Sequence, residues 1–249
     1  MLFGCTNNSN YSKEIIESIH SNDYDKFEKL LSKSKNLNVK PYSYDLDRVN
    51  MPPLHFACKE GKLDFVIKLV EAGADVNNCN HSLASSPLLV TLESNTENRF
   101  KIAKYLIEKG ANINIKANNF SVFDYVFTYN SNNYNETKEL EEFEFALYLL
   151  ERGASITDVR LGHVIFNAAK FNNKLMINYL YNTLNVNLDL QDISYGNTPL
   201  IWAVKFNCFN VVKYLLDNNV DQNIINNEGK TAKQIALEAN NLEIYNLFK

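Results

Sequence analysis

A short motif recurs along this chain about every 34 residues. Its copies occupy equivalent positions at Pro53, Pro87, Val122, Val164, Pro199 and Ala232, which are separated by 34, 35, 42, 35 and 33 residues. The clearest copies read Pro52-Pro53-Leu54-His55-Phe56-Ala57, Ser86-Pro87-Leu88-Leu89 and Thr198-Pro199-Leu200-Ile201-Trp202-Ala203. Self-similarity at a fixed period of this length is typical of repeat architectures, in which each unit packs on its neighbours.

A second motif follows each copy of the first. It reads Gly73-Ala74-Asp75-Val76-Asn77, Gly110-Ala111-Asn112-Ile113-Asn114 and Gly153-Ala154-Ser155-Ile156-Thr157, and it fades to Asn185-Val186-Asn187 and Asn219-Val220-Asp221. Pro53 suits the first turn of a helix, where its missing N–H costs nothing. Gly73 can adopt the left-handed conformation that ends a second helix. Each period therefore predicts a pair of short helices that must stack on neighbouring pairs to bury its apolar face.

Together the two motifs resemble those of the ankyrin-repeat family, over about residues 12 to 249. The resemblance implies an all-α fold, a solenoid of helix-turn-helix units joined by short hairpin loops. We expect residues 1–11 to be a flexible leader or tether, Ser12 to cap the first helix, and 12–249 to be one ankyrin-repeat domain. Its predicted parts are an N-terminal helical pair at 12–40, repeats at 41–80, 81–115, 116–158, 159–191 and 192–224, and a C-terminal cap at 225–249.

Two polar insertions interrupt the period between the helices of their units. They read Asn95-Thr96-Glu97-Asn98 and Asn130-Ser131-Asn132-Asn133-Tyr134-Asn135-Glu136-Thr137. Because lengthening a surface loop costs little closure entropy, we interpret both as neutral loops, with a binding role as the alternative.

Composition narrows the class of partner. The chain has 45% hydrophobic and 22% charged residues, enough for a packed core. Its 25 basic and 29 acidic residues give a net charge of −4, which argues against a binder of nucleic-acid phosphates. No apolar run approaches the roughly 18 residues of a membrane-spanning helix. Asparagine is frequent, and since it favours caps and turns, each cluster marks a candidate boundary.

No pattern in the sequence indicates catalysis, and we predict no catalytic, cofactor-binding or metal-binding residues and no small-molecule substrate. The four cysteines form no Cys-x-x-Cys pair, and Cys79-Asn80-His81 offers two ligands where a metal site needs three or four. His55 occupies the family motif, where a structural role is expected. The carboxylates of Glu141, Glu142 and Glu144 are interpreted as a solvated helix face at a helix start.

The resemblance implies that a partner protein binds in a concave groove lined by hairpin tips and by the exposed sides of the first helices. The candidate groove residues are Arg48, Met51, Lys59, Phe120, Tyr129, Arg160, Lys170, Phe171, Tyr195, Lys205 and Phe206. Aromatic residues beside basic ones suit a partner with acidic and apolar side chains. The alternative is that some of these rings belong to the core, and Trp202 is expected to be largely buried.

These features predict a non-enzymatic, monomeric scaffold for protein–protein interaction, cytoplasmic by default. An alternative is a lipid-anchored envelope protein, because Leu2-Phe3-Gly4-Cys5 resembles the end of a bacterial lipoprotein signal. Cys5 would then carry the lipid, the signal peptide would lie upstream of Met1, and a membrane would be a partner only in that case. A secreted effector of a host-associated microbe is a further alternative.

Overall fold

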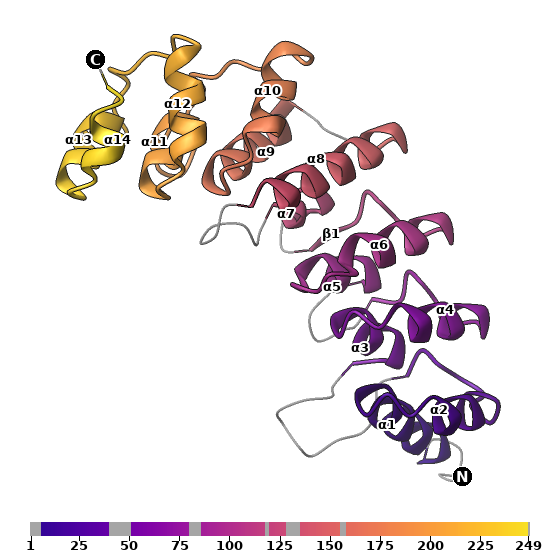
Figure 1. The fold of residues 1–249 in the computed structure, drawn as a ribbon. Coiled ribbons are helices and arrows are strands. Elements are labelled where there is room, and N and C mark those ends of the chain that lie inside the picture. Colours follow the sequence, from indigo (N-terminus) through magenta and orange to yellow (C-terminus); the bar gives the residue numbers. More distant parts are fainter. Residues whose placement is uncertain are drawn as a thin grey trace. The chain divides into compact units, whose positions relative to one another are not determined.

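The computed structural model describes residues 6–39, 51–79, 86–117, 120–127, 135–154 and 158–248. Within these ranges it contains fourteen helices and one antiparallel pair of two-residue strands, so the predicted all-α repeat fold is confirmed (Figure 1). The chain forms two compact units, residues 1–122 and 123–249, which are described separately. No helix of the described residues has both the length and the apolarity needed to span a bilayer.

In the first unit, successive helix pairs stack so that α3 packs on both α1 and α5, and α4 packs on α6. The two short strands, β1 and β2, follow the last pair and join each other through Lys116–Ser121 and Ala117–Phe120. The elements are α1 (Thr6–His20), α2 (Tyr24–Leu31), α3 (Pro53–Lys59), α4 (Leu63–Glu71), α5 (Pro87–Glu93), α6 (Arg99–Glu108), β1 (Lys116–Ala117) and β2 (Phe120–Ser121).

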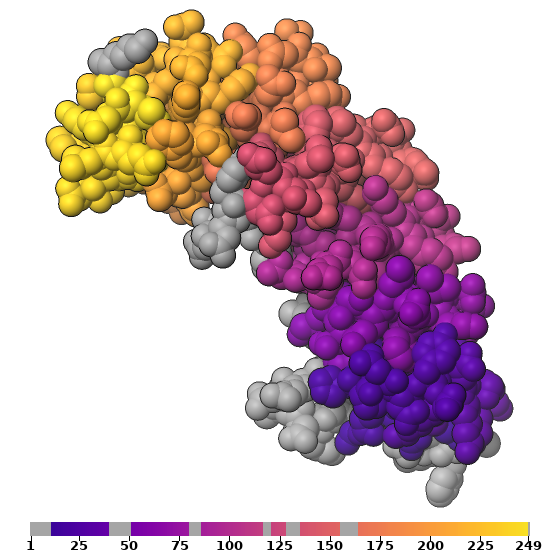
Figure 2. Space-filling view, in the orientation of Figure 1, coloured from indigo at the N-terminus to yellow at the C-terminus, as the bar shows by residue number. Residues whose placement is uncertain are grey.

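The second unit repeats the same arrangement. Helix α11 packs between α9 and α13, while α10 contacts α8 and α12. In Figure 2 the helix pairs of each unit follow one another in chain order, as adjacent slabs. The elements are α7 (Val122–Val126), which begins at the boundary, α8 (Glu136–Glu151), α9 (Asp158–Lys170), α10 (Lys174–Asn182), α11 (Pro199–Lys205), α12 (Phe209–Asp217), α13 (Ala232–Glu238) and α14 (Leu242–Tyr245).

The first motif works as its chemistry predicts. Pro53, Pro87 and Pro199 each begin a helix. The residue before α11, Thr198, accepts a hydrogen bond from Ile201 N–H at 3.2 Å, as an N-cap does. Four positions after the equivalent motif position lies a small residue that is fully buried in several units. These residues are Ala57, Ala168, Ala203 and Ala236. A methyl side chain there allows neighbouring helices to approach closely, which builds a continuous core across each unit.

The second motif joins one repeat to the next through its last residue. Asn77 accepts a hydrogen bond from Asn112 N–H at 2.8 Å and donates its amide to Gly110 C=O at 2.9 Å. In the second unit, Asp189, two residues after the faded copy Asn185-Val186-Asn187, accepts a hydrogen bond from Asp221 N–H at 2.9 Å. The hairpin ends of neighbouring repeats are therefore connected by side chains that satisfy backbone groups, which explains the spacing of the motif.

Many of the asparagines have a backbone role. Six described asparagines adopt a positive φ between 53° and 59°, the left-handed region in which Asn is the most tolerated residue after Gly. They are Asn22, Asn172, Asn185, Asn207, Asn219 and Asn240. Each follows the end of a helix. The high asparagine content therefore serves helix termination in these six cases.

Two sequence-based expectations differ from the structure. Helix α1 begins at Thr6, whereas the sequence placed its start at Ser12. Ser12 is buried, and it shares a helix face with Ile15, Ile16 and Ile19, so the predicted cap is part of the buried stripe of α1. Glu142 is also buried rather than solvated, because it accepts a hydrogen bond from the Asn173 amide at 3.4 Å, between α8 and the start of α10.

Candidate protein-interaction surface

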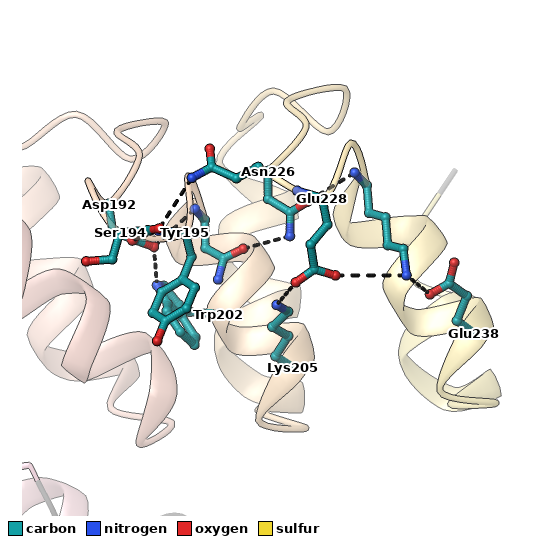
Figure 3. A network of polar contacts seen from close by, with 11 residues as sticks. Asp192, Ser194, Tyr195, Trp202, Lys205, Asn226, Glu228 and Glu238 are labelled. Carbon is teal, nitrogen blue, oxygen red and sulfur yellow. Dashed lines mark hydrogen bonds and ion pairs between the residues drawn. The ribbon is translucent and has the colours of Figure 1, made fainter.

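The structure brings four of the predicted groove residues together around Trp202 in the second unit. Lys170 ends α9, Lys205 ends α11, and Phe206 is the C-cap residue of α11. Tyr195 lies in the hairpin that leads into α11, and its ring stands beside that of Trp202 (Figure 3). The predicted partner surface of this unit is thus centred on a residue that was expected to be core.

Trp202 is mostly but not fully buried, in keeping with the expectation that it is largely buried. The indole is large, and its polar edge reaches the hairpin, where Nε1–H donates to Asp192 Oδ2 at 2.9 Å. Tyr195 meets the indole edge-on at 5.6 Å between ring centroids, and the Phe206 ring lies tilted at 5.9 Å. Three rings therefore form one continuous row at the surface of α11 and its hairpin.

Asp192 fixes the conformation of the hairpin that carries Tyr195. Besides the indole, its carboxylate accepts hydrogen bonds from Tyr195 N–H at 2.6 Å and Asn197 N–H at 3.0 Å. The next hairpin along the chain also contacts Tyr195, since Asn227 N–H donates to Tyr195 C=O at 2.9 Å. A Cβ at Gly196, whose φ is +65°, would come within 2.5 Å of Asn227 Oδ1, so the close contact of the two hairpins requires glycine. The backbone that presents Tyr195 is preorganised.

Lysines flank the row of rings, and carboxylates lie near them. The Nζ atom of Lys170 lies 3.9 Å from the Trp202 ring centroid, a cation–π contact. Burial lowers the pKa of Lys170, and the charges of Asp192 and Asp124 act in the opposite direction. Lys205 Nζ lies 5.9 Å from the same centroid and 3.2 Å from Glu228 Oε1.

The ion pairs continue onto the last helix pair. Lys230 Nζ lies 3.9 Å from Glu228 Oε2 and 2.6 Å from Glu238 Oε2, and the bond to Glu238 raises the pKa of Lys230. Figure 3 shows Lys205, Glu228 and Glu238 in a row along this side of the unit. The sequence expected basic residues that would attract an acidic partner, but these lysines already have carboxylate partners within the chain.

Apolar side chains at the hairpins extend this surface, and the sequence analysis missed them. Ile193 is 93% exposed and Ile225 is 54% exposed, while Tyr195 is 56% and Phe206 39% exposed. The two hairpins are connected, because Gln191 Nε2 donates to Gly196 C=O at 2.6 Å and to Ile225 C=O at 2.9 Å. The available signal was the presence of isoleucine in turns, outside any helix stripe. We call Ile193, Tyr195, Trp202, Phe206 and Ile225 the Trp202 surface.

The remaining candidates are more dispersed. Phe171 is half-buried next to Lys170, while Met51 is half-buried and Lys59 exposed in the first unit. Phe120 lies in β2 and Arg160 in α9. Arg48, Tyr129 and the possible lipidation residue Cys5 lie outside the described residues.

One histidine and two cysteines are placed for packing, whereas Cys79 is exposed. His55, Cys58 and Cys208 are buried. Burial raises the pKa of both thiols to about 12, so they stay protonated near neutral pH and are poor nucleophiles. A search of the described residues finds no group of three or more His, Cys, Asp or Glu side chains arranged to hold a metal ion.

Stacked helix pairs joined through their hairpins, with an aromatic surface on the first-helix side, define a helical repeat protein. A family profile for ankyrin repeats (three copies) matches residues 12–117 and 165–248. The chain therefore belongs to the ankyrin-repeat family. The unmatched stretch between these ranges contains the longest step of the repeat and the 16-residue helix α8.

A curated protein of Fowlpox virus (strain NVSL), described as an ankyrin repeat protein, is 30% identical over 198 residues. The alignment covers 74% of this chain and 53% of the viral protein, so the chain spans about half the length of that relative. Ankyrin repeats generally mediate protein–protein interaction, and the family is typically non-enzymatic.

Proposed function

We propose that this protein binds another protein through the Trp202 surface of its second unit, as a monomer and without catalysis of its own. The observation that carries the proposal is the row formed by Tyr195, Trp202 and Phe206, exposed on one side and fixed by hydrogen bonds on the other. Aromatic residues dominate the binding energy of protein interfaces because they bury much apolar area with few rotatable bonds.

The preorganised hairpin supports this function in a second way. Ordering a loop on binding costs free energy, and a hairpin already held by Asp192 and Asn227 avoids much of that cost. Lys170, Phe171 and Lys205 border the rings and complete the proposed contact. The other groove candidates, Arg48, Met51, Lys59, Phe120, Tyr129 and Arg160, remain proposed contacts of the same kind.

The test compares three forms of the full chain in crosslinking pull-downs from the source organism: wild type, Tyr195→Ala/Phe206→Ala, and Tyr181→Ala/Leu184→Ala. The last pair is a matched control, since Tyr181 and Leu184 are 36% and 38% exposed on and after α10. Proteins recovered by wild type and control should be lost, or weakened at least tenfold, with the Tyr195/Phe206 variant, because truncating an anchor costs about 1–2 kcal/mol.

Circular dichroism and thermal melting accompany the comparison. Because both rings are exposed, the Tyr195/Phe206 variant should keep its helical signal. Recovery of the same proteins by all three forms would exclude this surface as the interaction site. Loss of helical structure in the Tyr195/Phe206 variant would show that the rings serve the core instead.

A further inference from the structure

The charged side chains around the Trp202 surface have partners within the chain. Among the side chains that the structure describes there, three lysines face four carboxylates, namely Lys170, Lys205 and Lys230 against Asp124, Asp192, Glu228 and Glu238. Each lysine has at least one of these carboxylates as an ion-pair or electrostatic partner. Asp192 also accepts a hydrogen bond from the Trp202 indole, and Asp124 accepts one from the Asn167 amide, so none of these lysines is left unpaired for an acidic partner and none of these carboxylates for a basic one.

The ion pairs are also placed where they add little to binding. Lys205 and Glu228 keep 27% and 55% of their side-chain surface exposed, and Lys230 and Glu238 keep 36% and 56%. Exposed pairs of this kind are screened by water and salt, and at the rim of an interface they contribute little to affinity. A charged partner segment would have to compete with these existing pairs before it gained a contact.

The isoleucine side chains on the two hairpins, by contrast, are largely exposed to solvent. Ile193 projects almost its whole side chain from a hairpin, and Ile225 projects about half of its side chain from the next. An isoleucine in an exposed turn contributes nothing to the core of the repeat. Tyr195 and Phe206 are exposed as well, so four large exposed side chains lie on two linked hairpins and at the end of α11.

From the proposed function, on which this step rests, we infer that the segment bound at the Trp202 surface is apolar and carries no net charge. Its side chains pack on Ile193, Tyr195, Phe206 and Ile225, and the lysine–carboxylate pairs stay intact at the edge. Ile193 and Ile225 thereby become contact residues of the site. Binding driven by apolar contact is insensitive to salt, whereas attraction between exposed charges is screened over about 10 Å at 0.1 M salt.

The probe is a phage-displayed library of random short peptides, selected on the full-length protein. Peptides that also bind the Ile193→Ser/Phe206→Ser variant are removed, and the remaining peptides are sequenced and synthesised. Trp202 is the single tryptophan of the chain and lies inside the surface, so its fluorescence reports binding directly. Affinity is then measured from about 0.05 to about 0.5 M salt.

We expect the selected peptides to be rich in apolar residues with a net charge near zero, to change Trp202 fluorescence, and to vary less than about twofold in affinity with salt. Selection of acidic or basic peptides whose affinity falls about tenfold or more over this range would overturn the inference while leaving the proposed interaction site standing. If no peptide remains after those that bind the variant are removed, both the inference and the proposed function fail. Circular dichroism of the variant confirms that its fold is retained.

Discussion

Most helices of the two units end in different ways, although α1 of the first unit is followed by Asn22 and α8 of the second by Gly153. In the first unit, α3, α4 and α6 are followed by Gly61, Gly73 and Gly110, with φ values of +68°, +94° and +91°. In the second unit, α9, α10, α11 and α12 are followed by asparagines at positive φ: Asn172, Asn185, Asn207 and Asn219. The same left-handed turn is therefore made by two residue types.

The difference shows when glycine is required and when a side chain is useful. A Cβ at Gly61 would lie 2.6 Å from Thr96 Cβ, so the turn that carries Thr96 leaves no room for a side chain. Asn172 instead uses its side chain, which accepts a hydrogen bond from Val211 N–H at 3.3 Å in the next repeat. Likewise Asn207 accepts from the Asn241 amide at 2.7 Å. The sequence motif fades in the second unit, but the structural connection between repeats does not.

The largest effect is expected for Gly61→Ala. A positive φ costs an alanine about 1–2 kcal/mol, and the clash with Thr96 adds a similar amount, so the free energy of unfolding should fall by about 3 kcal/mol. Urea unfolding followed by circular dichroism measures this change. The control is Gly73→Ala, where no atom lies within 4 Å of the added Cβ and a loss of about 1 kcal/mol is expected. Equal losses at the two sites would show that Thr96 does not constrain Gly61.

A smaller effect is expected for Asn172→Ala. This change combines the cost of positive φ with the loss of the acceptor for the buried Val211 N–H, and the expected destabilisation is about 2 kcal/mol. Asn172→Gly relaxes the backbone and removes only the hydrogen bond, so about 1 kcal/mol should be lost. Both values come from urea titrations of the full chain. If the glycine variant is as stable as wild type, the asparagine side chain does not connect the repeats.

The smallest effect is expected for Asn219→Gly, where asparagine is exchanged for glycine at a positive φ and no neighbouring side chain constrains the choice. At Asn219, with φ +55°, replacement by Gly relieves backbone strain but makes the unfolded chain more flexible. The two effects oppose each other, and thermal melting should show a change within about 0.5 kcal/mol. A loss well above that value would mean that Asn219 has a structural role beyond its φ.

The insertion after α5 shows why such effects escape sequence reasoning. Asn95-Thr96-Glu97-Asn98 was interpreted as a neutral loop, yet Asn98 donates its amide to Gly61 C=O at 3.1 Å and Thr96 contacts Gly61. These contacts span more than thirty residues of sequence, and nothing in the local pattern marks them. The repeat period, the helix starts and the small alanines were predictable because each depends on residues within one or two helical turns.

The residues of the binding surface likewise include some that the sequence could predict and some that it could not. Tyr195, Phe206, Lys170 and Lys205 could be proposed from their repeat positions, since the repeat fixes which side of a helix pair each residue occupies. The role of Trp202 could not, because its ring contacts Asp192 in a hairpin ten residues earlier and Lys170 in the preceding helix pair. The pairing of the lysines with carboxylates could not either, because Lys205 and Glu228 come from different repeats.

By itself the sequence determined the family, the all-α repeat fold and the residues that begin and end most helices. These follow from local chemistry repeated at a regular spacing, so one sequence contains several copies of the same signal. Only the tertiary structure decided which side chains meet between repeats: Asn172 with Val211, Lys205 with Glu228, and Asp192 with the indole of Trp202. Such contacts depend on the register of one repeat against the next, and they pair the lysines of an apparently basic surface with carboxylates of the same chain.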